Sequence, residues 1–198
     1  EVGLNPVGVP ASLAITCMYM GSYLGSASTE GAKVITSSWH RPDNLCSPTG
    51  SKVNGTYVTS CLAKREAVRQ GANEAVTLNS VGQVAECTGE NIFVFRNGRI
   101  ITPPVSECIL DGITRNSVMQ IARDMGYDVV ETELTRTQLV TAEEVWMTGT
   151  AAEVVGVTYI DGRVIGDGKI GKVTEKIHAK FHAAATGKRA EQDLFELR

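Results

Sequence analysis

The chain has 198 residues, of which 42% are hydrophobic and 21% are charged, and its formal net charge at neutral pH is −3. This length and hydrophobic content suffice for one domain with a buried core. The dispersed lysines and arginines exclude a basic nucleic-acid-binding surface, and apolar runs such as 92–95 are far too short to cross a bilayer.

The five cysteines show no C-x-x-C spacing, which argues against a disulfide framework and against a zinc knuckle. The first residues include neither an initiator methionine nor a charged-then-apolar signal segment. We therefore expect a soluble protein of a reducing, cytoplasmic compartment, without membrane or nucleic-acid partners. The sequence reads as a processed chain or as a piece of a longer one.

Residues 1–10 have the composition of a linker, since glycine and proline alternate with single apolar residues. Clusters of β-branched residues predict strands at 13–17 and 33–38. The Gly/Ser-rich passage at 21–26, which separates them, is typical of an exposed loop.

The stretch 47–67, SPTGSKVNGTYVTSCLAKREA, carries one lysine between a turn and a predicted helix. Turn residues at 48–51 precede Lys52, and the helix is expected to end near Gly71. A lysine in such a position can be held away from water, and a desolvated amine loses its proton more readily and becomes nucleophilic. That behaviour suits a lysine that forms a Schiff base. The alternative is an ordinary solvated surface lysine.

The remaining patterns predict a mixture of strands and helices. Strands are expected at 74–78, 83–85, 91–96, 99–102, 127–134, 144–148, 154–160 and 163–165, and helices at 114–125, 137–143 and 173–185. The dipeptides Asn97-Gly98 and Asp161-Gly162 are strong hairpin signals. Residues 103–112 are expected to be an irregular loop. Hairpins interspersed with helices predict a mixed α/β (α+β) domain rather than a purely parallel, doubly wound sheet.

Three further stretches carry chemically useful groups. Glu86 and Glu90 are expected in a short turn between strands, where the alternative is a solvated acidic turn. Thr114 follows a glycine at a helix start, where free N–H groups and the helix dipole suit a phosphate, although the threonine alone would cap the helix. The small residues at 148–153 can present N–H groups and the hydroxyl of Thr150 to an anion.

Two other patterns are interpreted as structural. The segment 166–171, GDGKIG, matches G-x-G-x-x-G, but a hairpin precedes it and only one helix follows, so a turn is expected instead of a dinucleotide site. His178 and His182 lie four residues apart on a predicted helix, a spacing that can bind a metal. No H-E-x-x-H pattern surrounds them and no third ligand is evident, so we expect an exposed helix face and no metal.

Taken together, these motifs resemble the fold-type IV pyridoxal-phosphate enzymes, and most closely the branched-chain amino acid aminotransferases. The resemblance rests on the order and spacing of SSWHRP (37–42), SKVNGTY (51–57), AECTGENIFVF (85–95), TPP (102–104), LDGITR (110–115) and TGTAAE (148–153). It implies hairpin-rich mixed sheets in a pseudo-barrel with flanking helices. It also implies transfer of the amino group of leucine, isoleucine or valine to 2-oxoglutarate, with pyridoxal 5′-phosphate as cofactor.

The resemblance assigns roles to residues around the cofactor ring. It makes Lys52 the lysine that forms the Schiff base and then moves the proton during transamination. Tyr57 is expected to hydrogen-bond the phenolic oxygen of the cofactor, and Glu86 to face the pyridine nitrogen, keeping it protonated. Glu90 and Asn91 are expected to support the turn that carries Glu86, without a catalytic role.

The same resemblance implies that Ile113, Thr114 and Thr150 bind the cofactor phosphate. The turn formed by Thr150 and Ala151 is further expected to bind the α-carboxylate of the substrate through backbone N–H groups. D-amino acid transaminases and aminodeoxychorismate lyases share the fold, but the G-T-Y sequence after the lysine resembles the branched-chain enzymes more.

Members of the family carry a smaller N-terminal domain before the linker, whereas this sequence begins at the linker. The resemblance therefore divides the chain into a linker at 1–10 and a cofactor-binding large domain at 11–198. In the family the N-terminal domain supplies an arginine to the phosphate, one wall of the substrate pocket and part of the dimer, so a homodimer or higher homo-oligomer is expected. The remaining alternative is a folded large-domain fragment without turnover.

Overall fold

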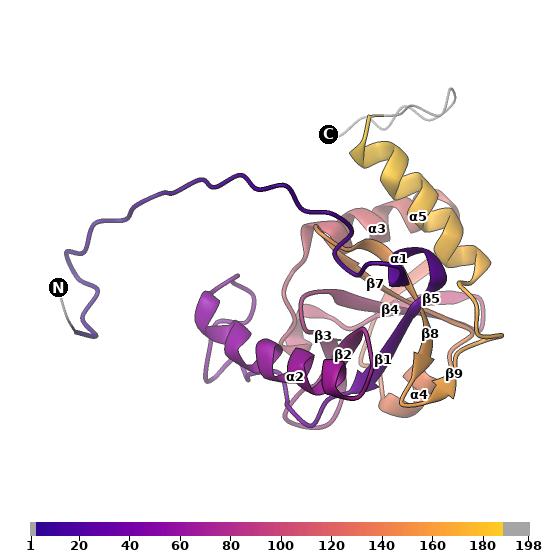
Figure 1. Ribbon diagram of the computed structural model, residues 1–198, viewed down its shortest axis with the longest axis horizontal. Helices are drawn as coiled ribbons and strands as arrows, with labels where there is room; N and C mark the ends of the chain where they lie inside the picture. Colours follow the sequence, from indigo (N-terminus) through magenta and orange to yellow (C-terminus); the bar gives the residue numbers. More distant parts are fainter. Residues whose placement is uncertain (1–2, 188–198) are drawn as a thin grey trace.

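The computed structural model describes residues 3–187 (Figure 1). Residues 1–2 of the predicted linker and residues 188–198 of the predicted domain lie outside this range. Residues 3–22 form no helix or strand and arc away from the sheet. The strand predicted at 13–17 is therefore wrong: Leu13 and Ile15 are 87% and 82% exposed, and no strand of the described residues lies beside them.

Within the described residues, nine strands form one sheet in the order β3-β2-β1-β8-β7-β4-β5-β6, and β9 pairs with β8 off this path. The strands are β1 (Ala32–Thr36), β2 (Glu74–Leu78), β3 (Val84–Cys87), β4 (Asn91–Arg96), β5 (Arg99–Thr102), β6 (Asp128–Glu131), β7 (Glu144–Gly149), β8 (Glu153–Ile160) and β9 (Arg163–Val164). The helices are α1 (Ala27–Glu30), α2 (Tyr57–Arg69), α3 (Ile113–Asp124), α4 (Arg136–Val140) and α5 (Lys172–Ala185), with 3₁₀ turns at Asn54–Thr56 and Val105–Glu107.

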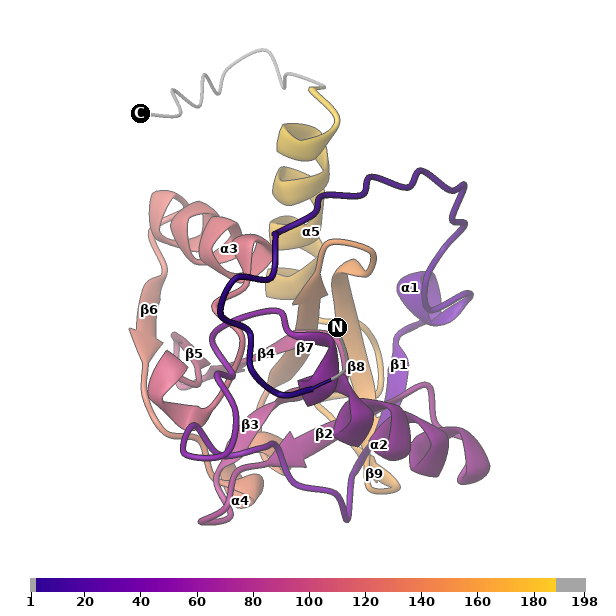
Figure 2. The same ribbon diagram turned by 90° about the vertical axis from the view of Figure 1, so that its left-hand side faces the viewer.

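Parallel pairing joins β1 to β2, β1 to β8 and β5 to β6, and the other pairs are antiparallel. The sheet curls into a half-barrel with helices on its outer side, as Figures 1 and 2 show. This arrangement confirms the predicted mixed α/β fold. Both predicted hairpins are present, because Asn97 and Asp161 adopt φ angles of 51° and 52° and the glycines that follow continue the turn.

The strands alternate their side chains between two apolar cores. In β4, Ile92 and Val94 point into the core enclosed by the curled sheet, whereas Phe93 points into the core beneath α3 and α5. There the Phe93 ring stacks on Trp146 with 5.5 Å between ring centroids. A smaller cluster lies under α2 and includes Ala63. Helices cover one face and the curl closes the other, which explains the nearly continuous apolar runs of β4, β7 and β8.

The glycine-rich segment 166–171 is a structural turn, as predicted. It leads into α5, whose first N–H groups are already capped by a carboxylate. Glu144 accepts hydrogen bonds from the backbone N–H of Val173 at 3.0 Å and of Thr174 at 2.8 Å. The carboxylate thus occupies the position that a bound phosphate would take at a dinucleotide site.

The other predicted elements match the structure to within a few residues at their ends. The Gly/Ser-rich passage is mostly exposed but continues into α1, which the sequence did not predict. All five cysteines are free. Among residues 3–187, no helix combines the length and the apolar character that crossing a bilayer requires.

Candidate active site

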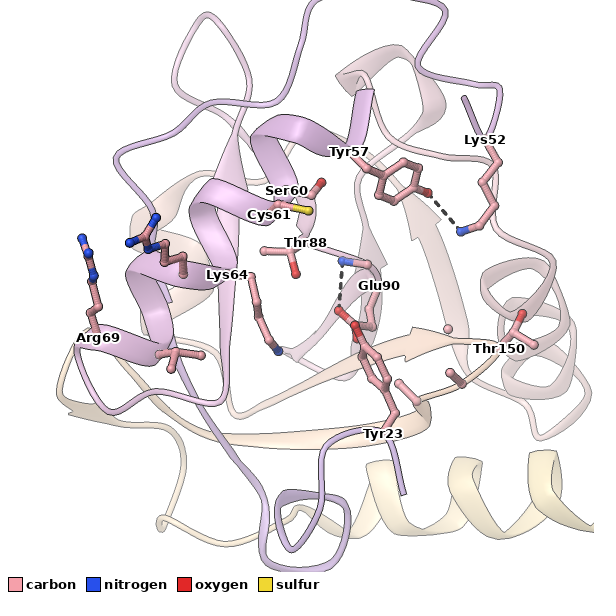
Figure 3. Close-up of a pocket in the computed structure, with 16 residues that line it drawn as sticks. Tyr23, Lys52, Tyr57, Ser60, Cys61, Lys64, Arg69, Thr88, Glu90 and Thr150 are labelled. Carbon is pink, nitrogen blue, oxygen red and sulfur yellow. Dashed lines mark hydrogen bonds between the residues drawn. The ribbon is translucent and has the colours of Figure 1, made fainter. Parts of the chain in front are cut away.

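A cavity of about 750 Å³ lies between α2 and the turn that joins β7 to β8 (Figure 3). Four separate parts of the chain form its walls. Residues that line it include Tyr23, Lys52, Tyr57, Glu90, Thr150 and Ala151. The structure thus brings four of the predicted site residues, two from each side, to one cavity.

Lys52 and Tyr57 form a hydrogen-bonded pair at the N-terminal end of α2. The 3₁₀ turn Asn54–Thr56 leads directly into α2, so Tyr57 is the first residue of this helix. The side chain of Tyr57 points toward Lys52. The Lys52 ammonium donates to the Tyr57 hydroxyl at 3.0 Å (Figure 3). Lys52 is nevertheless exposed in this chain, so the shielding from water expected of it is not observed here.

Thr150 and Ala151 belong to the turn on the opposite side of the cavity. Gly149 is the last residue of β7. An added Cβ at this position would lie 3.3 Å from the carbonyl oxygen of Gly89. A small residue is needed for this close approach between the two turns. As a result, the β3–β4 turn and the β7–β8 turn share the wall of the cavity.

Glu86 lies within β3 and not in the turn that the sequence predicted. It is buried, and both of its oxygens have partners: Oε1 pairs with the Arg41 guanidinium at 2.8 Å, and Oε2 accepts from Asn91 Nδ2 at 2.9 Å and from the Leu110 N–H at 3.0 Å. Burial raises the pKa of Glu86 to about 7, although Arg41, the Leu110 N–H and Lys52 each lower it. The expectation of a solvated acidic turn is therefore excluded.

Arg41 is a charged residue beside this site that the sequence patterns did not single out. Its side chain is only 3% exposed, and Nε donates to the Cys108 carbonyl at 3.0 Å. The backbone N–H of Arg41 also donates to the Leu78 carbonyl at 2.8 Å, which holds the segment after β1 alongside β2. The motif SSWHRP contained this arginine, but only the fold identifies Glu86 as its partner.

Asn91 has the supporting position that was expected of it, since its side chain donates both to Glu86 and to the Leu110 carbonyl at 2.9 Å. Glu90 is different, because it is buried and also lines the cavity. One of its oxygens accepts from the Gly89 N–H at 3.2 Å, and Oε1 has no hydrogen-bond partner among residues 3–187. Burial, followed by the nearby Glu74 carboxylate, raises the pKa of Glu90 to about 8.

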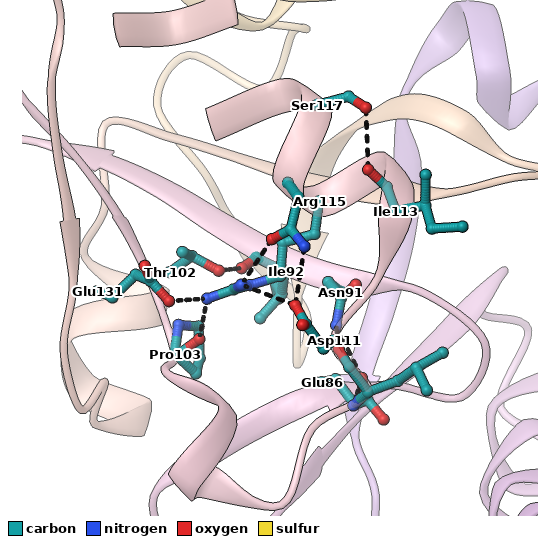
Figure 4. Close-up of polar contacts among 12 residues, drawn as sticks. Glu86, Asn91, Ile92, Thr102, Pro103, Asp111, Ile113, Arg115, Ser117 and Glu131 are labelled. Atoms are coloured by element: carbon teal, nitrogen blue, oxygen red, sulfur yellow. Dashed lines mark hydrogen bonds and ion pairs between the residues drawn. The ribbon is translucent and has the colours of Figure 1, made fainter. Parts of the chain in front are cut away.

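Helix α3 begins beside this network with Ile113 and Thr114, and within the described part of the chain no side chain caps its N-terminus. Its first N–H groups therefore remain available to an anion. Thr114 is buried, whereas the side chain of Ile113 is 83% exposed. The helix is held by Arg115, which donates to the Pro103 carbonyl at 2.9 Å and pairs with Glu131 at 2.6 Å (Figure 4).

Glu86, Ile113 and Thr114 are not among the residues that line the cavity in Figure 3. Glu86 is connected to it through the chain, because β3 leads directly into the turn whose residues Gly89 and Glu90 form part of the cavity wall. The site therefore combines a lysine–tyrosine pair, a buried carboxylate and an uncapped helix N-terminus. Such a set can hold an anionic ring compound and exchange a proton with it.

Known proteins are similar in sequence to this chain over most of its length. The branched-chain-amino-acid aminotransferase of Pseudomonas aeruginosa is 43% identical over 188 residues, which cover 94% of this chain and 61% of that protein. The chain thus spans about three-fifths of the length of this curated relative.

Solved structures of branched-chain amino acid aminotransferases are also similar. The Escherichia coli enzyme has a TM-score of 0.84 and 36% identity, covering 91% of this chain and 58% of that one. The T.th. enzyme in complex with 4-methylvaleric acid has a TM-score of 0.78 and 49% identity, covering 81% of this chain and 54% of that one. The same enzyme has been solved with N-(5′-phosphopyridoxyl)-L-glutamate. The model of the amino-transferase class IV family matches residues 6–160, and the chain belongs to this family.

Proposed function

We propose that this chain forms the cofactor-binding part of a pyridoxal-phosphate-dependent transaminase acting on branched-chain amino acids and 2-oxoglutarate. The observation that carries the proposal is that the hydrogen-bonded Lys52–Tyr57 pair and the Thr150–Ala151 turn line opposite sides of one cavity. In this proposal residues 1–10 are a linker, residues 11–198 form the large domain, and the active protein is a homodimer or a higher homo-oligomer.

The donor set fits pyridoxal phosphate. A phosphorylated pyridine aldehyde needs an amine for its carbonyl carbon, a carboxylate for its ring nitrogen and N–H donors for its phosphate. These three groups are supplied by Lys52, Glu86 and the uncapped start of α3. Glu86 is buried, and burial strengthens the attraction between its carboxylate and a pyridinium cation. When bound, the cofactor supplies an electron-poor ring that stabilises negative charge at the substrate Cα.

Lys52 acts as the nucleophile and then as the acid and base of the reaction. With the cofactor bound, its Nζ would take the proton from the substrate Cα and hold it for return to the reacting pair. Tyr57, whose hydroxyl is 3.0 Å from Nζ, orients the amine and donates to the phenolic oxygen of the cofactor. The tyrosine is held by a rigid element, since it is the first residue of α2.

Glu86 would hold the proton on the cofactor ring nitrogen, and Arg41 favours the ionised form of its carboxylate. Burial favours the protonated acid, with a pKa of about 7 in the chain alone, while Arg41 opposes this shift. A pyridinium cation at the same carboxylate lowers the pKa further, because an opposite charge favours the ionised form. The ion pair with Arg41 therefore prepares Glu86 for its partner.

Thr150 and Ala151 bind the substrate carboxylate through the N–H groups of their turn, and Thr150 joins Ile113 and Thr114 at the phosphate. The substrate class is supported by the T.th. relative bound to 4-methylvaleric acid, which is the carbon skeleton of leucine without its amino group. D-amino acid transamination and aminodeoxychorismate cleavage are the competing activities.

The test is to incubate the protein with pyridoxal phosphate, reduce it with borohydride and map the modified peptide by mass spectrometry. We expect a pyridoxyl adduct on Lys52 that is lost in Lys52→Ala and retained in Lys33→Ala, which removes an exposed lysine of β1. Amino exchange between leucine and 2-oxoglutarate is then measured, with D-alanine and aminodeoxychorismate as comparison substrates.

The outcomes separate the alternatives. An adduct on Lys52 together with leucine turnover supports the transaminase. The adduct without turnover of any substrate supports a large domain that binds cofactor but does not react. An adduct on another lysine contradicts the assignment of the site.

A further inference from the structure

A second cluster of polar side chains lies outside the cavity, where α5 packs against the start of β8. His178 and His182 are one helical turn apart on α5 and face the same side. Glu153, the first residue of β8, reaches them from the sheet. Its Oε2 lies 3.0 Å from His182 Nδ1 and 3.8 Å from His178 Nε2, and one candidate ligand atom from each residue lies within 4.8 Å of the others.

The backbone at Glu153 directs this carboxylate toward the helix. Glu153 has a φ angle of 58°, a left-handed conformation that is uncommon for residues other than glycine, asparagine and aspartate. It pairs with Gly149 across the β7–β8 turn and directly follows the residues that line the cavity. The cluster therefore connects α5 to the β7–β8 turn, which lines the cavity.

We propose that Glu153, His178 and His182 form a binding site for a divalent transition-metal cation of the Zn²⁺ type. Imidazole nitrogens and a carboxylate oxygen are ligands that Zn²⁺ prefers, at bond lengths of roughly 2.0–2.2 Å. Ligand atoms around a tetrahedral zinc ion are then about 3.3–3.5 Å apart, a spacing that the two observed separations from Glu153 bracket.

The site is open to solvent on one side, since the side chains of the two histidines are each 45% exposed and that of Glu153 is 39% exposed. Water completes the coordination there, as in zinc sites with three protein ligands. The sequence showed the histidine pair but no third ligand. Glu153 lies 25 residues before His178 and joins the pair only when β8 and α5 pack together.

Without a metal, the same residues form a half-exposed ion pair when a histidine is protonated. Exposed pairs of this kind contribute little to stability. A metal site differs in a measurable way, because one cation binds per chain and all three side chains contribute to its affinity. Binding also holds α5 against the β7–β8 turn and stabilises the folded protein by mass action.

The experiment is a Co²⁺ titration followed by visible absorbance, with Zn²⁺ as competitor and with the metal-induced shift in melting temperature as second readout. We expect saturation at one equivalent, ligand-field bands of a low-coordinate Co²⁺ ion, and a higher melting temperature with Zn²⁺. The variants H178Q, H182Q and E153Q should each weaken binding by at least about tenfold. The matched control is H40Q, which removes the third histidine, an exposed residue after β1.

The cysteines define the outcome that would overturn the proposal. Cys17, Cys46 and Cys61 are exposed and can bind the same cations. Thiolate-to-cobalt charge-transfer bands with binding that survives H182Q and E153Q would assign the metal to cysteines and refute the site. The proposal also fails if no saturable binding occurs, or if H40Q weakens binding as much as H182Q does.

Discussion

Replacing Arg41 by methionine removes the cation that lies against Glu86 while keeping an unbranched side chain in the space. The two side chains are 3% and 6% exposed, with 2.8 Å between Nη2 and Oε1. Removing one partner of such a buried pair costs about 3–5 kcal/mol when the remaining group stays charged. Glu86 can avoid part of this cost by taking up a proton, so the loss must depend on pH.

The direction of that dependence follows from the pKa of Glu86, which burial raises from 4.5 to about 7 in the folded chain. An acid with a raised pKa binds its proton more tightly when folded, so stability falls as pH rises from about 4.5 to about 7. Arg41 lowers this pKa, and R41M raises it further. In R41M the free energy of unfolding therefore continues to fall above pH 7, by up to about 1.4 kcal/mol per pH unit.

We expect R41M to lose about 3–5 kcal/mol near pH 8.5 and only about 1–2 kcal/mol near pH 5.5. At the lower pH Glu86 is neutral, and the main loss is the hydrogen bond from Arg41 to the Cys108 carbonyl. Urea unfolding of wild type, R41M, E86Q and the double variant, followed by circular dichroism at both pH values, measures these losses. Equal losses at the two pH values, or additive effects near pH 8.5, would refute the reasoning.

Three further predictions concern stability. E90Q should flatten the decline of stability between about pH 5 and pH 8, because burial raises the pKa of Glu90 to about 8. In this range the folded chain keeps the proton that the unfolded chain has already lost, which costs up to about 1.4 kcal/mol per pH unit. Thermal melts across this range test the prediction, and an unchanged slope would contradict it. G166A should cost about 2–4 kcal/mol, since its φ is 57° and a Cβ would meet a backbone carbonyl oxygen at 2.6 Å. G162A, with a φ of 74° and open surroundings, should cost only about 1 kcal/mol in the same unfolding assay; equal losses would exclude the clash. T135A should cost about 1 kcal/mol by removing the capping box of α4, measured by urea unfolding, and a change near zero would show that the cap is dispensable.

Features encoded by neighbouring residues were predictable from the sequence alone. The turns at Asn97-Gly98 and Asp161-Gly162 formed because both dipeptides adopt positive φ angles at low cost. The placement of Lys52 before a helix start likewise followed from a local run of turn residues. The order of short motifs along the chain was enough to identify the family, since that order reflects the whole fold.

Pairing between distant segments was decided only by the tertiary structure. Residues 13–17 have strand-forming side chains, yet none of the nine strands found within residues 3–187 lies beside them and they stay exposed. Glu86 looked like a residue of a solvated turn, but Arg41, 45 residues earlier, and the Leu110 N–H make it a buried ion pair. Local sequence determines the preferred backbone conformation of a segment, whereas burial and charge partners depend on which remote segments pack against it. The composition of a segment does not contain that information.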